Sequence, residues 1–206
     1  MEMIPINIAV EDKLSEAVIR KILNASKRSY IVGACFCRGG SGYLKKNIRG
    51  FNNASKASVF LLLTDLDTTD CAPTLIRQWL TCPQNPNFMF RIAVKEIESW
   101  ILADRINFSN YLGIPVQRIP LITDEINDPK QFILNLSDKS KKSSLRNGMI
   151  FRHKDTLKPG PDYNAKNWQK KANRLIHYAS DQLLKIKSKP LQFLKERGLK
   201  LSTIIK

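Results

Sequence analysis

Segments typical of buried strands alternate with segments of helical periodicity over the first hundred residues of this 206-residue chain. Four short runs rich in apolar and β-branched residues predict strands at residues 5–10, 30–37, 58–63 and 88–94. Apolar residues at helical spacing predict helices at residues 12–25, 43–48, 73–80 and 96–103. Because the connections are short, this alternation predicts an α/β fold in which a mostly parallel four-stranded sheet is flanked by helices.

The second half of the chain is less regular, and we expect it to be mainly helical. Asp128-Pro129 is a typical N-cap and first-turn pair that opens a helix to about residue 136. A further helix is predicted over residues 164–184. We therefore divide the chain into an α/β domain, residues 1–105, and a basic, mainly helical region, residues 106–206, that packs on or extends the first domain.

Charge is distributed unequally between the two halves. The chain carries 34 Lys and Arg against 18 Asp and Glu, a formal net charge of +16. Residues 1–104 contain 13 basic and 10 acidic residues, whereas residues 105–206 contain 21 and 8. Such an excess attracts polyanions, chiefly nucleic acid, although long basic side chains also simply solvate helix faces. We predict phosphate contacts from six residues of the second half: Lys139, Lys141, Lys142, Arg146, Arg152 and Lys154.

Nothing in the sequence predicts a membrane-bound or secreted protein. The longest apolar runs, such as residues 59–63, are far shorter than the roughly 20 residues of a spanning helix. The N-terminus has no basic stretch typical of a signal peptide, and the four cysteines are irregularly spaced. We therefore expect a cytoplasmic protein with reduced cysteines.

Acidic residues follow the predicted strands. Glu11 comes directly after the first strand, and Asp65 and Asp67 come just after the third. Because chemistry in open α/β sheets lies beyond the carboxyl ends of the strands, we expect these side chains to lie close together. Carboxylates that crowd in this way repel one another unless a divalent cation neutralises them, and hard oxygen ligands select Mg²⁺ or Mn²⁺.

Glu96, after the fourth strand, is a further candidate catalytic residue. Glu98 follows two residues later, and on a helix such a pair diverges, so we expect Glu98 to be structural or to act through another residue. The simpler alternative is that these acids only cap helices or interact with helix dipoles, as Asp70 would at the helix after the third strand.

Other motifs carry less weight. The loop Arg38-Gly39-Gly40-Ser41-Gly42 either approaches a phosphate or is a flexible turn, and it lacks the Gly-Lys-Ser/Thr ending of a P-loop. We therefore predict no cofactor besides the metal. Lys95 is a further candidate phosphate contact. We expect the tryptophans to be core residues, and His153, in the basic loop of residues 151–154, to be solvated or near a phosphate.

These residues resemble the TOPRIM fold shared by topoisomerases, primases and the overcoming-lysogenization-defect type nucleases. The resemblance rests on Ile8-Ala9-Val10-Glu11 and on Asp65-x-Asp67. Further segments, at residues 63–67, 71–73, 91–104, 128–130 and 160–164, look like a prokaryotic family related to TOPRIM nucleases of phage-defence systems. The resemblance covers about residues 6–178.

The resemblance implies a nuclease effector of bacterial phage defence that works beside an ATPase partner. In TOPRIM nucleases the matching Glu takes part in acid/base or metal chemistry and the two matching Asp bind metal, which transfers to Glu11, Asp65 and Asp67. Asp12 stands where many TOPRIM proteins have Gly, so the local geometry differs there.

Two functions from different classes stay open. The first is an Mg²⁺-dependent nuclease in which Glu11, Asp65 and Asp67 bind the metal, Glu96 assists, and the second half binds the phosphates of DNA or RNA. The alternative is a non-catalytic nucleic-acid-binding module, or an adaptor regulated by an ATPase partner.

Overall fold

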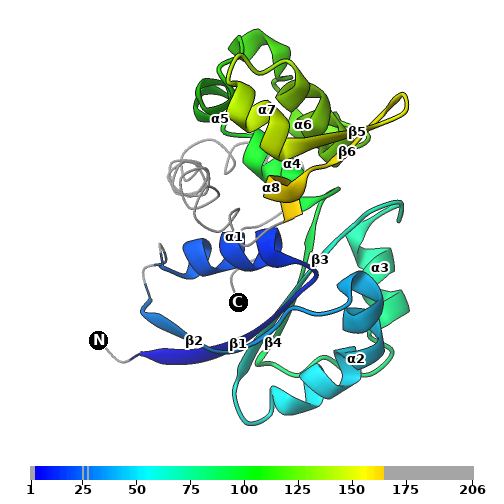
Figure 1. Cartoon of the computed structure of the whole chain (residues 1–206). Coiled ribbons are helices and arrows are strands. Elements are labelled where there is room, and N and C mark those ends of the chain that lie inside the picture. The colour runs from blue at the N-terminus through cyan, green and yellow to red at the C-terminus, as the bar shows by residue number, and fades with distance from the viewer. Residues whose placement is uncertain (1–2, 25, 27, 165–206) are drawn as a thin grey trace.

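A parallel four-stranded sheet forms the centre of the first part of the molecule. The computed structural model describes residues 3–24, 26 and 28–164. The strands are β1 (Ile4–Val10), β2 (Tyr30–Phe36), β3 (Val59–Asp65) and β4 (Phe88–Ala93). Their order is β2-β1-β3-β4, and every neighbouring pair is parallel (Figure 1). The predicted α/β fold with its four-stranded sheet is confirmed.

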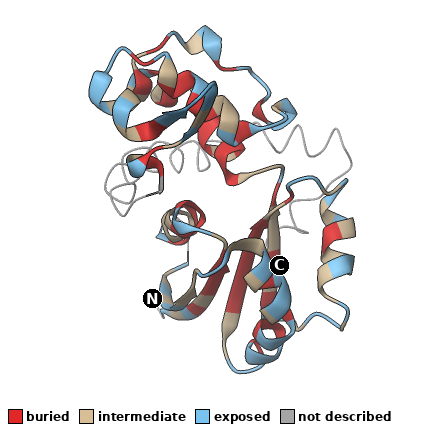
Figure 2. Ribbon diagram, turned by 45° about the vertical axis from the view of Figure 1, so that its right-hand side comes forward, coloured by how far each residue is buried: buried red, intermediate tan, exposed pale blue. Residues whose placement is uncertain are grey.

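Helices cover both faces of this sheet. Helix α1 (Lys13–Asn24) lies on one face, and α2 (Gly40–Ala54) and α3 (Ala72–Trp79) lie on the other (Figure 1). Because successive strand residues point to opposite faces, Ile8 packs in the cluster that includes α1, whereas Ala9 packs in the cluster that includes α2. Buried residues are concentrated in the strands and along the inner sides of the helices (Figure 2).

The rest of the described chain forms a helical part. It contains α4 (Ile97–Leu102), α5 (Arg105–Leu112), α6 (Pro129–Asp138), α7 (Ser143–Met149) and α8 (Pro161–Asn164), with two 3₁₀ helices, η1 (Val116–Arg118) and η2 (Thr123–Glu125). The Asp128 carboxylate accepts the backbone N–H of Gln131 at 2.7 Å, so this residue caps α6 as predicted. The helical character of the second half is confirmed for these residues.

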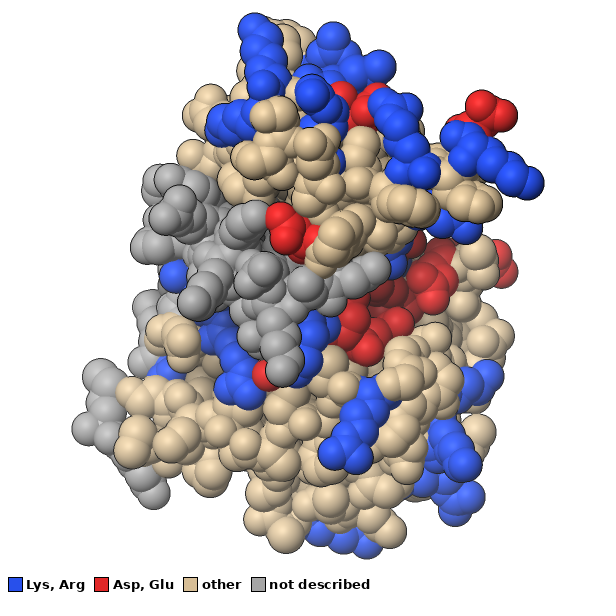
Figure 3. Space-filling model, viewed as in Figure 1, with Lys and Arg blue, Asp and Glu red and all other residues tan. Residues whose placement is uncertain are grey.

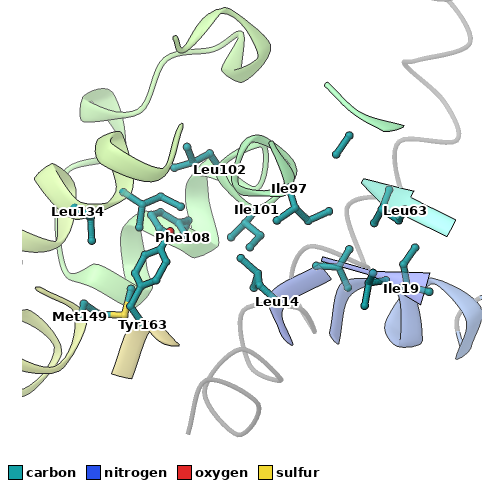
Figure 4. Close-up of a cluster of buried hydrophobic side chains, with 14 of the residues drawn as sticks. Leu14, Ile19, Leu63, Ile97, Ile101, Leu102, Phe108, Leu134, Met149 and Tyr163 are labelled. Carbon is teal, nitrogen blue, oxygen red and sulfur yellow. The ribbon is translucent and has the colours of Figure 1, made fainter. Parts of the chain in front are cut away.

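One buried cluster joins the sheet to the helical part. It contains Leu14 of α1, Leu63 of β3, Ile97 of α4 and Tyr163 of α8, among other residues (Figure 4). The cluster therefore includes residues on both sides of position 105. This shared core holds the helical part at the carboxyl ends of the strands.

Several local expectations were wrong. Helix α2 begins at Gly40, inside the expected turn, because Gly39 and Gly40 adopt left-handed backbone angles (φ 66° and 63°) that glycine tolerates. Asp70 does not cap α3, since Cys71 occupies the N-cap position. The second half also contains an unpredicted antiparallel hairpin of β5 (Ile150–His153) and β6 (Thr156–Pro159).

Some expectations concern residues beyond those the structure describes, namely the helix at residues 164–184 and the core position of Trp168. Trp79 and Trp100 are partly buried and pack against the two hydrophobic clusters, as expected. Within residues 3–24, 26 and 28–164, no helix has both the length and the apolar character needed to cross a bilayer.

Candidate functional site

The carboxyl edge of the sheet brings Glu11 and Asp65 together. Val10, the last residue of β1, is in register with Leu63 of β3, so Glu11 lies beside Thr64 and Asp65. The Glu11 Oε1 atom accepts the backbone N–H of Asp65 at 2.9 Å and also the Thr64 hydroxyl. The predicted proximity of these two acids is therefore correct, and it follows from the parallel register.

Asp65 connects the sheet to the helical part. Its Oδ1 atom accepts the backbone N–H of Ile97, the first residue of α4, at 3.0 Å. Burial, and after it the charges of Glu11, Glu98, Asp12 and Asp67, together raise the pKa of this carboxyl to about 9. With no cation bound, Asp65 therefore keeps its proton at neutral pH.

The pKa of Glu11 is also shifted by burial and by neighbouring acids. Burial raises its pKa, the hydrogen bonds from Thr64 and Asp65 lower it, and the charges of Asp67 and Asp12 raise it. Asp12 also accepts the backbone N–H of Ser15 at 2.8 Å, so it caps the start of α1 at the position where the TOPRIM pattern has Gly.

Asp67 is exposed in the turn that follows β3. Its φ of 49° lies in the left-handed region, which is uncommon for a residue other than glycine and costs about 1 kcal/mol or more. Backbone N–H groups of Leu66 and Asp67 donate to the Lys95 carbonyl at 2.9 and 3.1 Å and hold this turn against the end of β4. The turn thereby keeps the Asp67 charge near the other acids.

Glu96 precedes α4, but its side chain is hydrogen-bonded to α6. It occupies the N-cap position of α4 without capping it, and its Oε2 atom accepts the backbone N–H of Lys130 in the first turn of α6 at 3.1 Å. Burial raises the pKa of Glu96, and the charges of Asp128 and Asp67 raise it as well, against the Lys130 hydrogen bond.

Glu98 makes a buried contact within the protein, which fits the expectation that it is structural or acts through another residue. It is only 2% exposed, and its Oε1 atom accepts the Tyr163 hydroxyl at 2.8 Å. Burial raises the pKa of Glu98, Lys130 and the Tyr163 hydrogen bond lower it, and the net result is a pKa of about 6. Glu98 in turn raises the pKa of Asp65, so its charge reaches the predicted metal ligands.

We refer to these six carboxylates, Glu11, Asp12, Asp65, Asp67, Glu96 and Glu98, as the acidic edge. Figure 3 shows a patch of Asp and Glu side chains in a hollow between the sheet and the helical part. Across the described chain, ion pairs within 4.0 Å involve Glu16 and Asp138, and none involves the acidic edge. Lys130 responds to the cluster at longer range: burial lowers its pKa, but Glu98, Asp12, Glu96 and Asp65 raise it overall.

The acidic edge has the ligand chemistry of a Mg²⁺ or Mn²⁺ site but not its assembled geometry. Its donors are all hard oxygens, and no Lys or Arg of the described chain forms an ion pair with them. However, no three His, Cys, Asp or Glu side chains in the described segments are arranged as a metal-ligand group. Glu11 and Asp65 instead direct one oxygen each to backbone N–H groups. The structure brings the predicted ligands to one edge and leaves them as separate carboxylates.

Tyr163 and Lys130 were not predicted as site residues. Tyr163 lies 65 positions from its partner Glu98 in the sequence, and no local pattern connects them. Both residues occur in segments that carry the TOPRIM-family resemblance, at residues 128–130 and 160–164, and this is the one sequence signal that could have found them.

Three of the six predicted phosphate contacts have well-formed partners within the protein. Lys142 Nζ donates to the carbonyls of Asn110 and Tyr111 at 2.9 and 2.6 Å, at the end of α5. Arg146 donates to the Ser140 carbonyl at 3.0 Å, and Arg152 pairs with Asp138. These three side chains therefore make contacts that stabilise the protein itself.

The remaining three basic residues are more open. Lys139 lies 3.9 Å from Asp138, and Lys141 and Lys154 are exposed. Lys95, the other candidate phosphate contact, donates to the Asn127 side chain at 3.0 Å.

The described residues therefore place carboxylates without an ion pair at the strand ends and exposed basic side chains on the helical part. Such a combination can bind a hard divalent cation and attract a polyanion to the same region. Comparison of the chain with protein-family models, with curated proteins and with solved structures finds no match.

Proposed function

We propose that this protein is a metal-dependent nuclease that hydrolyses phosphodiester bonds in DNA or RNA. In this proposal Glu11, Asp65 and Asp67 bind Mg²⁺ or Mn²⁺, and Glu96 lies beside them. The observation that supports it most strongly is the gathering of six carboxylates at the carboxyl edge of the sheet, with no Lys or Arg of the described chain within ion-pair distance.

A purely structural use accounts poorly for this arrangement. Crowded and partly buried carboxylates destabilise a fold when they are ionised, and burial together with the neighbouring acids raises the pKa of Asp65. A divalent cation supplies the missing positive charge. When bound, it also provides Lewis-acid activation of a phosphodiester.

The residues of this chain have distinct parts in the proposal. Backbone N–H groups orient Glu11, Asp65 and Glu96 by fixing one oxygen of each carboxylate and leave the other oxygen for a cation. Basic side chains of the helical part attract the phosphate backbone of the substrate.

The TOPRIM resemblance supports the same assignment. It extends the proposal to an effector of bacterial phage defence, located in the cytoplasm, that is controlled by an ATPase partner. These extensions rest on the resemblance and stay predictions.

Cleavage assays test the proposal. The purified full-length protein is incubated with labelled single- and double-stranded DNA and RNA in Mg²⁺, Mn²⁺ or EDTA. We expect cleavage in the presence of metal and a loss of about 100-fold or more in Asp65→Ala. Asp70→Ala, which removes an exposed acid just beyond the acidic edge, is the matched control and should cleave normally. Equal cleavage by wild type and Asp65→Ala would contradict the proposal.

A non-catalytic nucleic-acid-binding module is the second candidate, and the lack of an assembled three-ligand group among the described residues favours it. It predicts binding that weakens steeply with salt and is unchanged by EDTA. It also predicts that no substrate in the panel is cleaved with either metal.

A further inference from the structure

The β5–β6 hairpin has one packed face and one open face. In its antiparallel register Phe151 is opposite Lys158, and His153 is opposite Thr156. Side chains opposite each other share a face, so these four residues form one face, which we call the outer face. All four residues are exposed, and the exposed fraction of Phe151 is 56%.

The opposite face of the hairpin is tied to the protein. Ile150 is 7% exposed, and Leu157 packs against the core that Ile150 belongs to. Arg152, on the same face, pairs with Asp138 of α6. The outer face therefore has a fixed orientation, since the hairpin cannot turn over without breaking these contacts.

Phe151 stands out among the exposed apolar residues of the described chain. The other large ones, Met3, Ile31, Val94, Ile106, Leu121 and Ile122, are all aliphatic. Single exposed apolar residues are common and need no explanation. Phe151, however, shares its face with Lys158 and His153, and Lys154 follows at the turn. An aromatic ring beside cations is the composition of a surface that stacks bases and binds phosphates.

The hairpin is anchored next to the acidic edge. Gly160 follows β6, and its N–H donates to the Met149 carbonyl at 3.0 Å, which closes the base of the hairpin. Three residues further on, Tyr163 donates its hydroxyl to Glu98. A Cβ at Gly160 would lie 2.6 Å from the Gly148 carbonyl oxygen, so only glycine permits this close packing.

A short segment of chain therefore connects the base of the hairpin to the acidic edge. Phe151 is the second residue from the base of the hairpin, and each strand residue adds about 3.3 Å. In Figure 1 the hairpin projects to the right from the helical part, and Figure 3, in the same view, shows the Asp and Glu side chains in the hollow below it.

We propose that the outer face of the hairpin binds a single strand of nucleic acid, with one base stacked on Phe151 and the neighbouring phosphates near Lys158 and Lys154. The proposal rests on the proposed function, because it assigns the form of nucleic acid that reaches the acidic edge. Bases of a duplex are stacked on one another and do not expose a face to Phe151, whereas those of a single strand do.

Binding measured in EDTA tests this proposal separately from cleavage. The full-length protein is titrated with a labelled single-stranded DNA, the corresponding RNA, and a DNA duplex of the same sequence, and fluorescence anisotropy gives Kd. We expect Phe151→Ala to weaken single-strand binding by about 5- to 150-fold and to change duplex binding little. Phe151→Trp should restore the affinity. Lys158→Ala should reduce the salt dependence of log K, because one phosphate contact is lost.

Ile106→Ala is the matched control, because it truncates an exposed apolar residue on α5 and should leave Kd unchanged. Single-strand binding by Phe151→Ala within twofold of wild type would overturn the proposal, as would no binding of any strand by wild type. Equal losses for single strand and duplex would also overturn it, because base stacking would not be the cause.

The two proposals fail in different ways. If Phe151→Ala binds normally while wild type cleaves in an Asp65-dependent manner, the hairpin proposal fails and the nuclease stands. If binding depends on Phe151 but no metal supports cleavage, the nuclease fails and the single-strand surface stands. The DNA and RNA arms show which sugar the surface accepts.

Discussion

The acidic edge and the basic residues of the helical part differ in whether their charged side chains are paired within the protein. Residues 1–104 are almost balanced, with 13 basic and 10 acidic residues, yet they supply the six carboxylates of the acidic edge, none of which forms an ion pair with a Lys or Arg of the described chain. The helical part is strongly basic, yet Lys142, Arg146 and Arg152 bind carbonyls or a carboxylate of their own chain. The net charge of a region therefore does not locate a site, whereas unbalanced charge does.

The acids are held in place by backbone donors from successive elements. Glu11 after β1 accepts from β3, Asp65 of β3 accepts from α4, and Glu96 before α4 accepts from α6. Tyr163 of α8 completes the series by donating to Glu98. Neutral donors orient these carboxyl groups without supplying positive charge, so each group still has an oxygen that can bind a cation.

The largest predicted effect is the change with pH in the free energy of unfolding, measured without divalent cations. Asp65 has a pKa of about 9 in the folded protein and an ordinary value of 3.8. Below pH 4 both states hold the proton, and Asp65 contributes nothing. As the pH rises towards 9, the unfolded chain loses the proton while the folded protein keeps it, so stability falls. The total loss is on the order of several kcal/mol.

Urea unfolding in EDTA between about pH 5 and pH 9 measures this effect. Asp65→Asn keeps an oxygen for the Ile97 N–H and removes the charge, so its stability should fall less with pH than that of wild type. Asp70→Asn should follow wild type. Parallel curves for wild type and Asp65→Asn would show that Asp65 is ionised in the folded protein.

Divalent cations should reverse this destabilisation. At a Mg²⁺ concentration one hundred times Kd, binding to the folded state adds about 2.7 kcal/mol. This corresponds to a rise of about 5–10 °C in Tm for a chain of this size. The rise should be absent in Asp65→Asn and present in Asp70→Asn, and thermal unfolding followed by circular dichroism measures it. An equal rise in all three proteins would place the Mg²⁺ elsewhere.

The link between Tyr163 and Glu98 should have the next largest effect. Tyr163→Phe leaves a buried carboxylate oxygen without its donor, and we expect a loss of about 2 kcal/mol in the free energy of unfolding at neutral pH. The loss should shrink below the Glu98 pKa of about 6, where this side chain is neutral. Tyr30→Phe, on the far strand β2, should change stability little. A loss for Tyr163→Phe that does not vary with pH would mean that Glu98 is not the partner that matters.

Two neighbouring lysines provide the smallest and most selective comparison. Lys142→Met removes an ammonium that binds two carbonyls at the end of α5 and keeps the aliphatic stem, so it should lower stability by about 1 kcal/mol. Lys141→Met should leave stability within about 0.5 kcal/mol of wild type. Lys141→Met should weaken nucleic-acid binding more than Lys142→Met does. If Lys142→Met weakened binding more than Lys141→Met, a lysine that hydrogen-bonds within the protein would still contribute to nucleic-acid binding.

The strands were predictable because their apolar periodicity is local. The β5–β6 hairpin was not, since its strands have four residues each and its turn, Lys154-Asp155, lacks the usual glycine. Lys154 takes a φ of 53° there, and the hairpin is stabilised by Ile150 and Leu157 in the core rather than by turn preference.

The acidic edge was predictable only in part. Glu11 and Asp65 could be placed together because parallel strands end at one edge. Glu98 was separated from Glu96 by assuming that both lie on a helix, but Glu96 is extended (φ −138°, ψ 158°), so the helical spacing does not apply to the pair.

The sequence by itself determined the layered α/β fold, the position of acids at strand ends and the basic character of the second half, because each depends on periodicity, order or composition along the chain. Only the tertiary structure decided which charges stay unbalanced. Lys142 and Arg152 find partners 32 and 14 residues away, and Tyr163 reaches Glu98 across 65 residues. Electrostatic balance depends on distances in space, and folding sets those distances.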